Sequence, residues 1–167
     1  MKMEPNPNES IVEIVAYRPE FRAAFEALNL EWLEAYSLLE PIDFDYLQNP
    51  EARILAKGGQ LFFALQAGTV VGTCAAVRVS NDVIELAKLA VSPAAQGQGI
   101  GRRLSETVIE HARNQGATSV ILMSNSMLAQ AIRLYESMGF QYAPLPENTV
   151  YERANVYMTL ALQPEAD

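Results

Sequence analysis

Three glycines at alternate positions, Gly97, Gly99 and Gly101, lie between an apolar run and a predicted helix. Backbone N–H groups at the start of a helix have no acceptor within the helix, and the helix dipole adds positive potential there. Glycine lets such amides point into one concavity, and its missing Cβ leaves room for the oxygens of an anion. The segment therefore has the chemistry of a phosphate-binding loop.

Several phosphate-bearing ligands use glycine loops, and spacing distinguishes among them. A Walker loop needs Lys and then Ser or Thr after its last glycine, whereas Gly101 is followed by Arg102 and Arg103. A dinucleotide-binding loop has the spacing G-x-G-x-x-G, whose third glycine position falls on Arg102 here. The pyrophosphate of coenzyme A and a turn without a ligand remain as alternatives.

The elements that would position this loop follow from hydrophobic periodicity and turn residues. Helices are predicted at residues 19–36, 41–59, 100–116 and 127–138. Strands are predicted at residues 10–17, 117–123, 140–145 and 150–162, with a three-stranded meander across residues 60–91. The resulting order of elements is β-α-α-β-β-β-α-β-α-β-β. It predicts one domain at residues 10–163, preceded by a flexible tail at residues 1–9.

The glycine loop and a second block downstream resemble the GNAT-type N-acetyltransferases. Gln96, Gly99 and Gly101 match that superfamily's Q/R-x-x-G-x-G/A pattern, and "AIRLYESMGF" matches its second block, a helix that ends in L-Y-x-x-x-G-F. The resemblance covers about residues 10–162, and residues 27–43 and 151–162 also resemble a bacterial single-domain branch. It implies an α/β acyl-CoA N-acyltransferase fold, with a mixed, mostly antiparallel sheet split at its middle and helices on both faces.

The same resemblance implies that acetyl-CoA binds across the loop and the strand before it. Backbone groups of that strand would pair with the pantetheine arm, and the loop amides would hold the pyrophosphate. Many members carry Asn at the position of Leu128, so Asn125 is the expected polar contact instead. The residues expected to contact the cofactor are Leu89, Ala90, Val91, Gln96, Gly97, Gln98, Gly99, Ile100, Gly101, Arg102 and Asn125.

Two side chains match catalytic positions of the family. Glu85 lies in the central strand "IELAKLAV", where several members have a glutamate that acts as general base, often through water. Partial burial would raise its pKa and suit it to that work, whereas pairing with Lys88 would make it structural. Tyr135 is the expected acid for the departing sulfur of coenzyme A, and its alternative is packing on the apolar face of its helix.

The acceptor site is expected in the two N-terminal helices, which line the acceptor cleft in relatives. Trp32 and Tyr36 lie in the first helix, and Arg153 and Asn155 share one face of the predicted last strand. The resemblance implies direct transfer of an acetyl group to a primary amine of a small or amino-acid-like molecule. A non-catalytic acyl-CoA sensor and a peptide or protein N-acetyltransferase are the alternatives.

Composition limits the other partners. The chain has 167 residues, 50% of them apolar, and its formal charge is −8, which is unfavourable for binding nucleic acid or anionic membrane. Cys74 is the only cysteine, and no His, Cys or carboxylate cluster has metal-ligand spacing, so we expect no metal. The polar N-terminus and the lack of a long apolar run predict a cytoplasmic protein. Dimers are common in the family, so a homodimer is possible.

Overall fold

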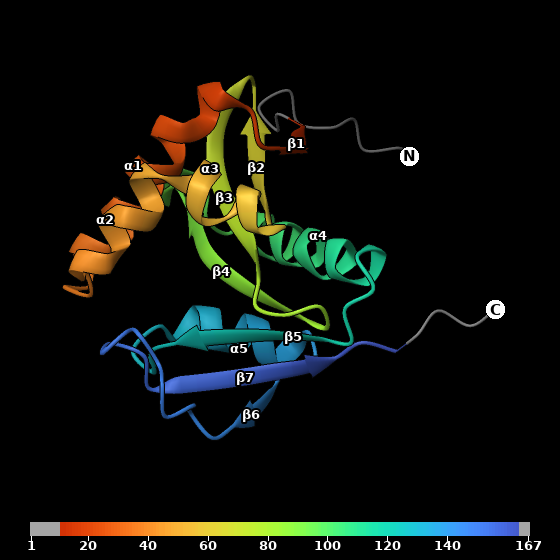
Figure 1. Cartoon of the computed structure of the whole chain (residues 1–167). Coiled ribbons are helices and arrows are strands. Elements are labelled where there is room, and N and C mark those ends of the chain that lie inside the picture. The colour runs from red at the N-terminus through yellow and green to blue at the C-terminus, as the bar shows by residue number, and fades with distance from the viewer. Residues whose placement is uncertain (1–10, 164–167) are drawn as a thin grey trace, which may run out of the picture.

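The computed structural model describes residues 11–163, so the tail predicted at residues 1–9 lies outside the described residues. Figure 1 shows a single sheet with helices packed against it. The strands are β1 (Val12–Ala16), β2 (Gln60–Gln66), β3 (Thr69–Arg78), β4 (Val83–Val91), β5 (Ser119–Ser124), β6 (Gln141–Ala143) and β7 (Val156–Ala161). The helices are α1 (Arg22–Ala35), α2 (Pro41–Gln48), α3 (Pro50–Arg53), α4 (Ile100–Asn114) and α5 (Ala129–Ser137). Short 3-10 turns lie at Pro19–Phe21, Leu55–Lys57 and Pro93–Ala95.

The sheet has the order β1-β2-β3-β4-β5-β7-β6, and only the β4–β5 pair is parallel. The predicted meander of β2, β3 and β4 is confirmed. Its first turn uses Ala67 at φ 51° and Gly68 at φ 77°, the left-handed conformations that a tight hairpin requires. The α4 crossover then places β5 parallel to β4. The expected mixed, mostly antiparallel sheet is therefore the one observed.

The sheet is split between its two central strands. β4 and β5 pair only where residues 83–85 meet residues 119–121. Beyond that point the two strands diverge, as Figure 1 shows. From Leu86 onward, the edge of β4 that faces β5 consequently has no strand partner among residues 11–163. A gap in a parallel ladder exposes backbone N–H and C=O groups that another extended molecule can pair with.

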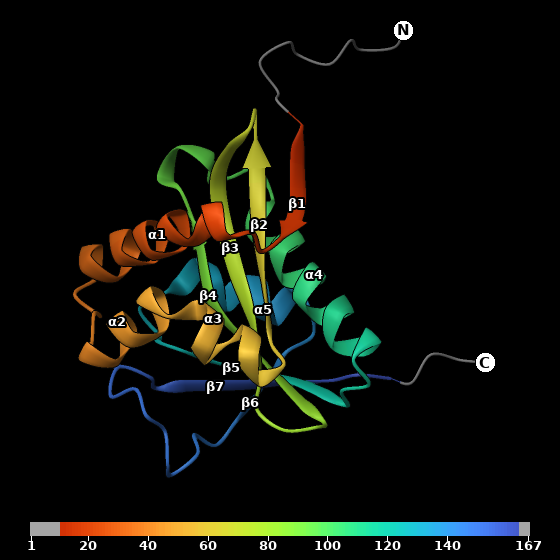
Figure 2. The same ribbon diagram turned by 45° about the horizontal axis from the view of Figure 1, so that its top comes forward.

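Helices cover both faces of the sheet, and each face has its own core. On one face, α1, α2 and α3 pack around Phe25, Leu33 and Phe63, all fully buried. On the other, α4 and α5 pack around Leu104, Val108 and Leu122. Figure 2 shows α1 to α3 on the near side of the sheet and α4 behind it. The split in the sheet thus has a layer of helices on each side.

The structure corrects the prediction for the last strand. β7 begins at Val156, and residues 150–155 form an irregular segment before it. The backbone N–H groups of Glu152 and Arg153 donate to the Glu40 carboxylate at 2.9 and 3.2 Å, so they are not available to a strand ladder. The alternation had predicted that Arg153 and Asn155 share one face of a strand. They do not, because both precede β7.

Two other boundaries also differ from the predictions. The helical region predicted at residues 41–59 is divided at Asn49, because Pro50 lacks an N–H and starts a new helix. The last helix begins at Ala129 instead of residue 127, since the Asn125 side chain accepts the N–H of Met127 at 2.9 Å and holds a turn there.

Candidate active site

A cavity of about 780 Å³ opens where β4 and β5 separate. It runs from the glycine loop at the start of α4 to side chains of α1 and α2, and α5 forms part of its wall. Most of the predicted site residues line it: Trp32, Tyr36, Glu85, Leu89, Ala90, Val91, Gln96, Gly97, Gly99, Ile100, Gly101, Arg102, Asn125, Tyr135 and Arg153. The structure thus brings together residues from distant parts of the chain around one hollow.

The glycine loop presents free amides to this cavity. Gly97 and Gly99 adopt φ values of 82° and 77°, which side-chain-bearing residues rarely adopt. The first hydrogen bond of α4 joins the N–H of Arg103 to the carbonyl of Gly99 at 3.1 Å. Within residues 11–163, the N–H groups of residues 97–102 donate to no acceptor, and a Cβ on Gly97 or Gly99 would meet no atom within 4 Å. These amides and this open space fit a bound pyrophosphate.

A β-bulge lies on β4 beside the split. Thr73 pairs with Ala90 and Ala75 with Ala87, so Cys74 of β3 faces both Lys88 and Leu89. Lys88 takes a left-handed conformation, with φ 57°. Such a bulge turns the following backbone groups out of the regular ladder. The bulge overlaps the start of the stretch, residues 89–91, whose backbone was expected to contact the cofactor.

Glu85 occupies the last position at which β4 still pairs with β5, opposite Ile121. Its side chain lines the cavity, and its carboxylate makes no hydrogen bond within the described part of the chain. Burial raises the pKa of Glu85, and the nearby positive charge of Lys88 opposes that rise. A carboxylate with a raised pKa and no partner is suited to accept a proton.

Tyr135 lies on the opposite wall, in α5. Only 6% of the residue is exposed, and its ring contacts Phe140 edge-on at a centroid distance of 5.8 Å. Burial, and then the neighbouring Cys74, raise the pKa of the Tyr135 hydroxyl above its usual value. The hydroxyl donates to no group among residues 11–163, although the side chain lines the cavity. It is therefore packed on the apolar face and still protonated at neutral pH.

The end of the cavity beside α1 and α2, which was expected to hold the acceptor and is called the acceptor end, contains a charged cluster that the sequence did not reveal. We call it the Asp43 cluster and define it as Glu40, Asp43, Lys88, Tyr151 and Arg153. Lys88 Nζ donates to Asp43 Oδ1 at 3.0 Å and to the Tyr151 hydroxyl at 3.1 Å. Both terminal nitrogens of Arg153 donate to Asp43, the Nη2 bond at 2.9 Å. The cluster thus joins α2, the bulge of β4 and the segment before β7.

Burial and pairing shift the pKa values in this cluster. Burial alone would raise the pKa of Asp43, but the hydrogen bond from Arg153 and the charge of Lys88 outweigh it and lower that pKa. Burial lowers the pKa of Lys88, and its pairing with Asp43 opposes the change. Burial also raises the pKa of the Tyr151 hydroxyl. Alternating polarity along the chain gives no signal for these contacts, because the partners are far apart in sequence.

Three residues that were predicted to contact a substrate make hydrogen bonds within the protein. Asn155 lies outside the cavity wall, and its Oδ1 accepts the N–H of Ser126 at 2.9 Å. Gln98 also lies outside the wall, where its Oε1 accepts a hydrogen bond from Gln66 at 2.9 Å. Asn125 lines the cavity, but its side chain donates to the carbonyl of Arg153 at 2.7 Å and so also holds the segment before β7 in place.

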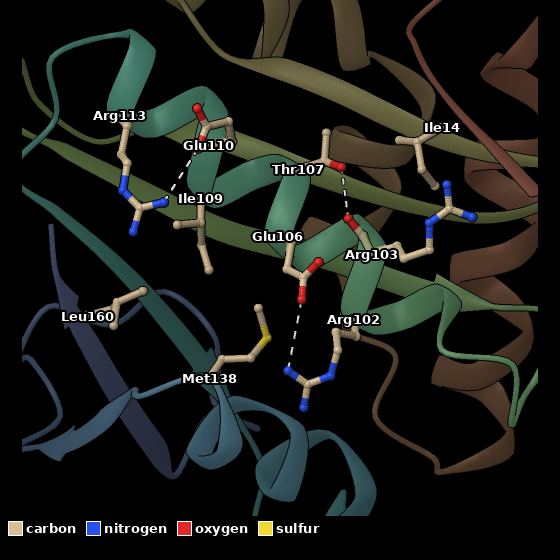
Figure 3. A pocket seen from close by; sticks show the side chains of 10 residues that line it. All are labelled: Ile14, Arg102, Arg103, Glu106, Thr107, Ile109, Glu110, Arg113, Met138 and Leu160. Atoms are coloured by element: carbon tan, nitrogen blue, oxygen red, sulfur yellow. Dashed lines mark hydrogen bonds and ion pairs between the residues drawn. The ribbon is translucent and has the colours of Figure 1, made fainter. Parts of the chain in front are cut away.

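A second hollow, of about 710 Å³, lies along the outer face of α4 (Figure 3). Arg113 lies 3.5 Å from Glu110, and Arg102 lies 4.0 Å from Glu106 on the same helix. Figure 3 shows these charges along α4, with Met138 and Leu160 across from them. Arg102 also lines the first cavity, but neither Glu85 nor Tyr135 reaches this hollow. The candidate active site is therefore the cavity in the split.

Comparison with known proteins agrees with this geometry. The model of the acetyltransferase (GNAT) family matches residues 21–140. The chain belongs to this family. Its structure resembles a GNAT-family acetyltransferase of Staphylococcus aureus Mu50, with a TM-score of 0.83, 22% identity and coverage of 92% of this chain and all of the other. The GNAT fold expected from the sequence is thus confirmed.

Two further similarities concern the ligand and the length of the relatives. The yncA protein of Salmonella typhimurium, solved with its cofactor acetyl-CoA, is 25% identical, with a TM-score of 0.74 and coverage of 95% and 98% of the two chains. N-acetyltransferase 8 of Rattus norvegicus is 38% identical over 90 residues, which are 51% of this chain and 40% of that protein. The chain thus spans less than half the length of this curated relative. Within residues 11–163, no helix combines the length and hydropathy needed to cross a membrane.

Proposed function

We propose that the protein is an N-acetyltransferase that moves the acetyl group of acetyl-CoA to the primary amine of a small molecule, with both substrates bound together. One observation carries this proposal. The same cavity has helix N-terminal amides at one end and the Glu85 carboxylate at the other, and neither has a hydrogen-bond partner among residues 11–163. Family membership supports acetyl-CoA as the donor. Direct transfer needs no covalent enzyme intermediate, and the only cysteine, Cys74, is fully buried in β3.

Acetyl-CoA would supply an acetyl group already activated as a thioester. The N–H groups of residues 97–102 would hold its pyrophosphate, and the unpaired edge of β4 would pair with its pantetheine arm. A backbone N–H near Leu89 or Ala90, beside the bulge, would donate to the thioester oxygen as negative charge develops there. The backbone of this chain would thus supply the main contacts to the donor.

Glu85 and Tyr135 would handle the protons. An alkyl amine is mostly protonated at neutral pH, so a base must remove a proton before the nitrogen can attack. The Glu85 carboxylate would accept that proton, directly or through one water molecule. Tyr135, held protonated by burial, would donate its proton to the departing sulfur and recover one as the attacking nitrogen loses its second proton. Trp32, Tyr36 and Arg153 would form the walls around the acceptor.

Release of free CoA tests this function. The protein is incubated with acetyl-CoA and a panel of primary amines, and thiol is measured over time against a no-acceptor control. Amine-dependent release with a stoichiometric N-acetyl product is expected. Tight acetyl-CoA binding without turnover on any amine or peptide would instead indicate a sensor. Turnover confined to peptides would indicate a peptide N-acetyltransferase.

A further inference from the structure

We propose that the acceptor is a primary amine carried on an uncharged, apolar body, and that the site discriminates against acceptors that carry a carboxylate. This inference rests on the proposed function and narrows its substrate class. It follows from how the Asp43 cluster uses its two cations, and from what else lines the acceptor end of the cavity.

Lys88 and Arg153 are the cations that a carboxylate in this part of the cavity would meet, and both are already paired. The Lys88 ammonium donates to Asp43 and to Tyr151, and its side chain is only 7% exposed. Arg153 binds both oxygens of Asp43, whose side chain is fully buried. A paired cation offers an incoming anion much less than a free one, because its attraction is cancelled by its partner.

A second carboxylate neutralises the remaining positive charge of the cluster. Glu40 Oε2 lies 3.5 Å from Nη1 of Arg153, and the Glu40 side chain is 19% exposed. Asp43 and Glu40 together neutralise Lys88 and Arg153, and Glu85 adds a further acidic group to the cavity wall. A ligand carboxylate would thus lose its hydration in a site with no surplus positive charge, which is unfavourable.

The rest of the acceptor end is aromatic and apolar. Trp32, Tyr36, Tyr46, Tyr151 and Val150 line it. Tyr36 is 47% exposed and Val150 is 62% exposed, so apolar surface is available at the mouth. These surfaces favour an apolar body, because its burial removes apolar area from water.

The rings of this wall already contact the ammonium group of a lysine. Lys88 Nζ lies 4.9 Å from the centre of the Tyr151 ring and 5.5 Å from that of Tyr46. Arg153 also lies over the Tyr151 ring, at 4.2 Å, so resident cations already use the attraction of these faces and the rings offer an acceptor apolar surface instead. The site therefore favours an apolar acceptor body and disfavours a carboxylate end.

Matched acceptors test the inference. Phenethylamine, phenylalaninamide and phenylalanine share one aromatic body, and only phenylalanine carries a carboxylate. We expect kcat/KM for CoA release with phenylalanine to be at least about tenfold below that with either of the others. Equal or faster turnover of phenylalanine would overturn the inference and leave the proposed function standing. No release with any amine would overturn the proposed function, and the inference with it.

Two variants test the electrostatic cause. Glu40→Gln removes one negative charge beside Arg153, while the Gln amide oxygen can still accept a backbone N–H. It should raise the ratio of kcat/KM for phenylalanine to that for phenethylamine at least about threefold. The free-energy difference behind such a change is a fraction of what one ion pair contributes. Glu31→Gln is the matched control, because Glu31 is exposed and lines neither cavity. A ratio unchanged in Glu40→Gln, or raised equally in Glu31→Gln, would contradict the role of the cluster.

Discussion

The position of Glu85 on β4 determines the environment of its carboxylate. It lies at the last paired residue of β4, so its side chain points into the cavity at the place where the sheet opens. Burial raises its pKa, and Lys88 is close enough to oppose the rise but not close enough to form an ion pair within 4.0 Å. The sequence indicated the candidate base through the family resemblance. It could not show that the carboxylate has no hydrogen-bond partner in the described part of the chain.

Replacing Glu85 should remove the proton acceptor and leave the fold intact. We expect Glu85→Gln to lower kcat by roughly 10²–10⁴-fold, the range that a positioned base contributes. Wild-type kcat/KM should rise with pH as Glu85 loses its proton, above the usual range for glutamate because its pKa is raised. The variant should lack this acidic limb. Wild-type kcat with an unchanged pH profile in Glu85→Gln would exclude Glu85 as the base.

Tyr135 requires a test that separates chemistry from packing. Tyr135→Phe keeps the ring against Phe140 and removes only the hydroxyl, which donates to no group within residues 11–163. It should lower kcat by about tenfold or more, with acetyl-CoA affinity nearly unchanged. Steady-state kinetics and calorimetric titration of acetyl-CoA measure the two effects separately. An unaltered kcat would assign Tyr135 to packing alone.

At the scale of elements, the Asp43 cluster holds three parts of the chain together. Asp43 comes from α2, Lys88 from the bulge of β4, and Arg153 from the segment before β7. A left-handed residue other than glycine, such as Lys88 at φ 57°, persists only when its surroundings favour it. The buried ammonium and its partners supply that constraint, and so they stabilise the bulge beside the proposed thioester site.

Two aspartates of α2 provide a matched comparison of stability. Asp43→Ala leaves Lys88 and Arg153 without their buried partner, and should lower the free energy of unfolding by about 3–5 kcal/mol. Asp45→Ala removes an exposed ion pair with Arg53 and should change that energy by less than about 1 kcal/mol. Urea unfolding of both variants measures the difference. Equal effects would show that the cluster does not stabilise the fold.

Periodicity and turn residues predicted most elements, because local patterns determine them. The hairpin at Gly68 and the helix after the glycine loop are examples. The start of β7 was mispredicted, because Glu40, far away in sequence, captures the backbone N–H groups of Glu152 and Arg153. The bulge at Lys88 was also outside the reach of local patterns, since it depends on the register of β3 against β4. Long-range contacts of this kind set the shape of the acceptor end.

For the whole molecule, the split sheet is the feature that turns these elements into one site. The parallel pairing of β4 and β5 stops after three residues of each strand, and the cavity occupies the space between them. The glycine loop lies at one end of that cavity, and the Asp43 cluster reaches the other end. A donor held along β4 would thus have its phosphates at the loop and its acetyl group near Glu85. The central claim is that acetyl-CoA binds in this split, with its pyrophosphate on the loop amides.

Calorimetric titration of acetyl-CoA into the wild type and two glycine variants tests this claim most directly. Gly99→Glu places a negative side chain at the loop, whereas Gly68→Glu makes the same change in the hairpin between β2 and β3. Both glycines have φ 77° and no atom within 4 Å of an added Cβ, so the backbone strain is matched. One molecule of acetyl-CoA should bind to the wild type and to Gly68→Glu, and none should bind to Gly99→Glu. Wild-type affinity in Gly99→Glu would contradict the assignment of the loop and of the split as the acetyl-CoA site.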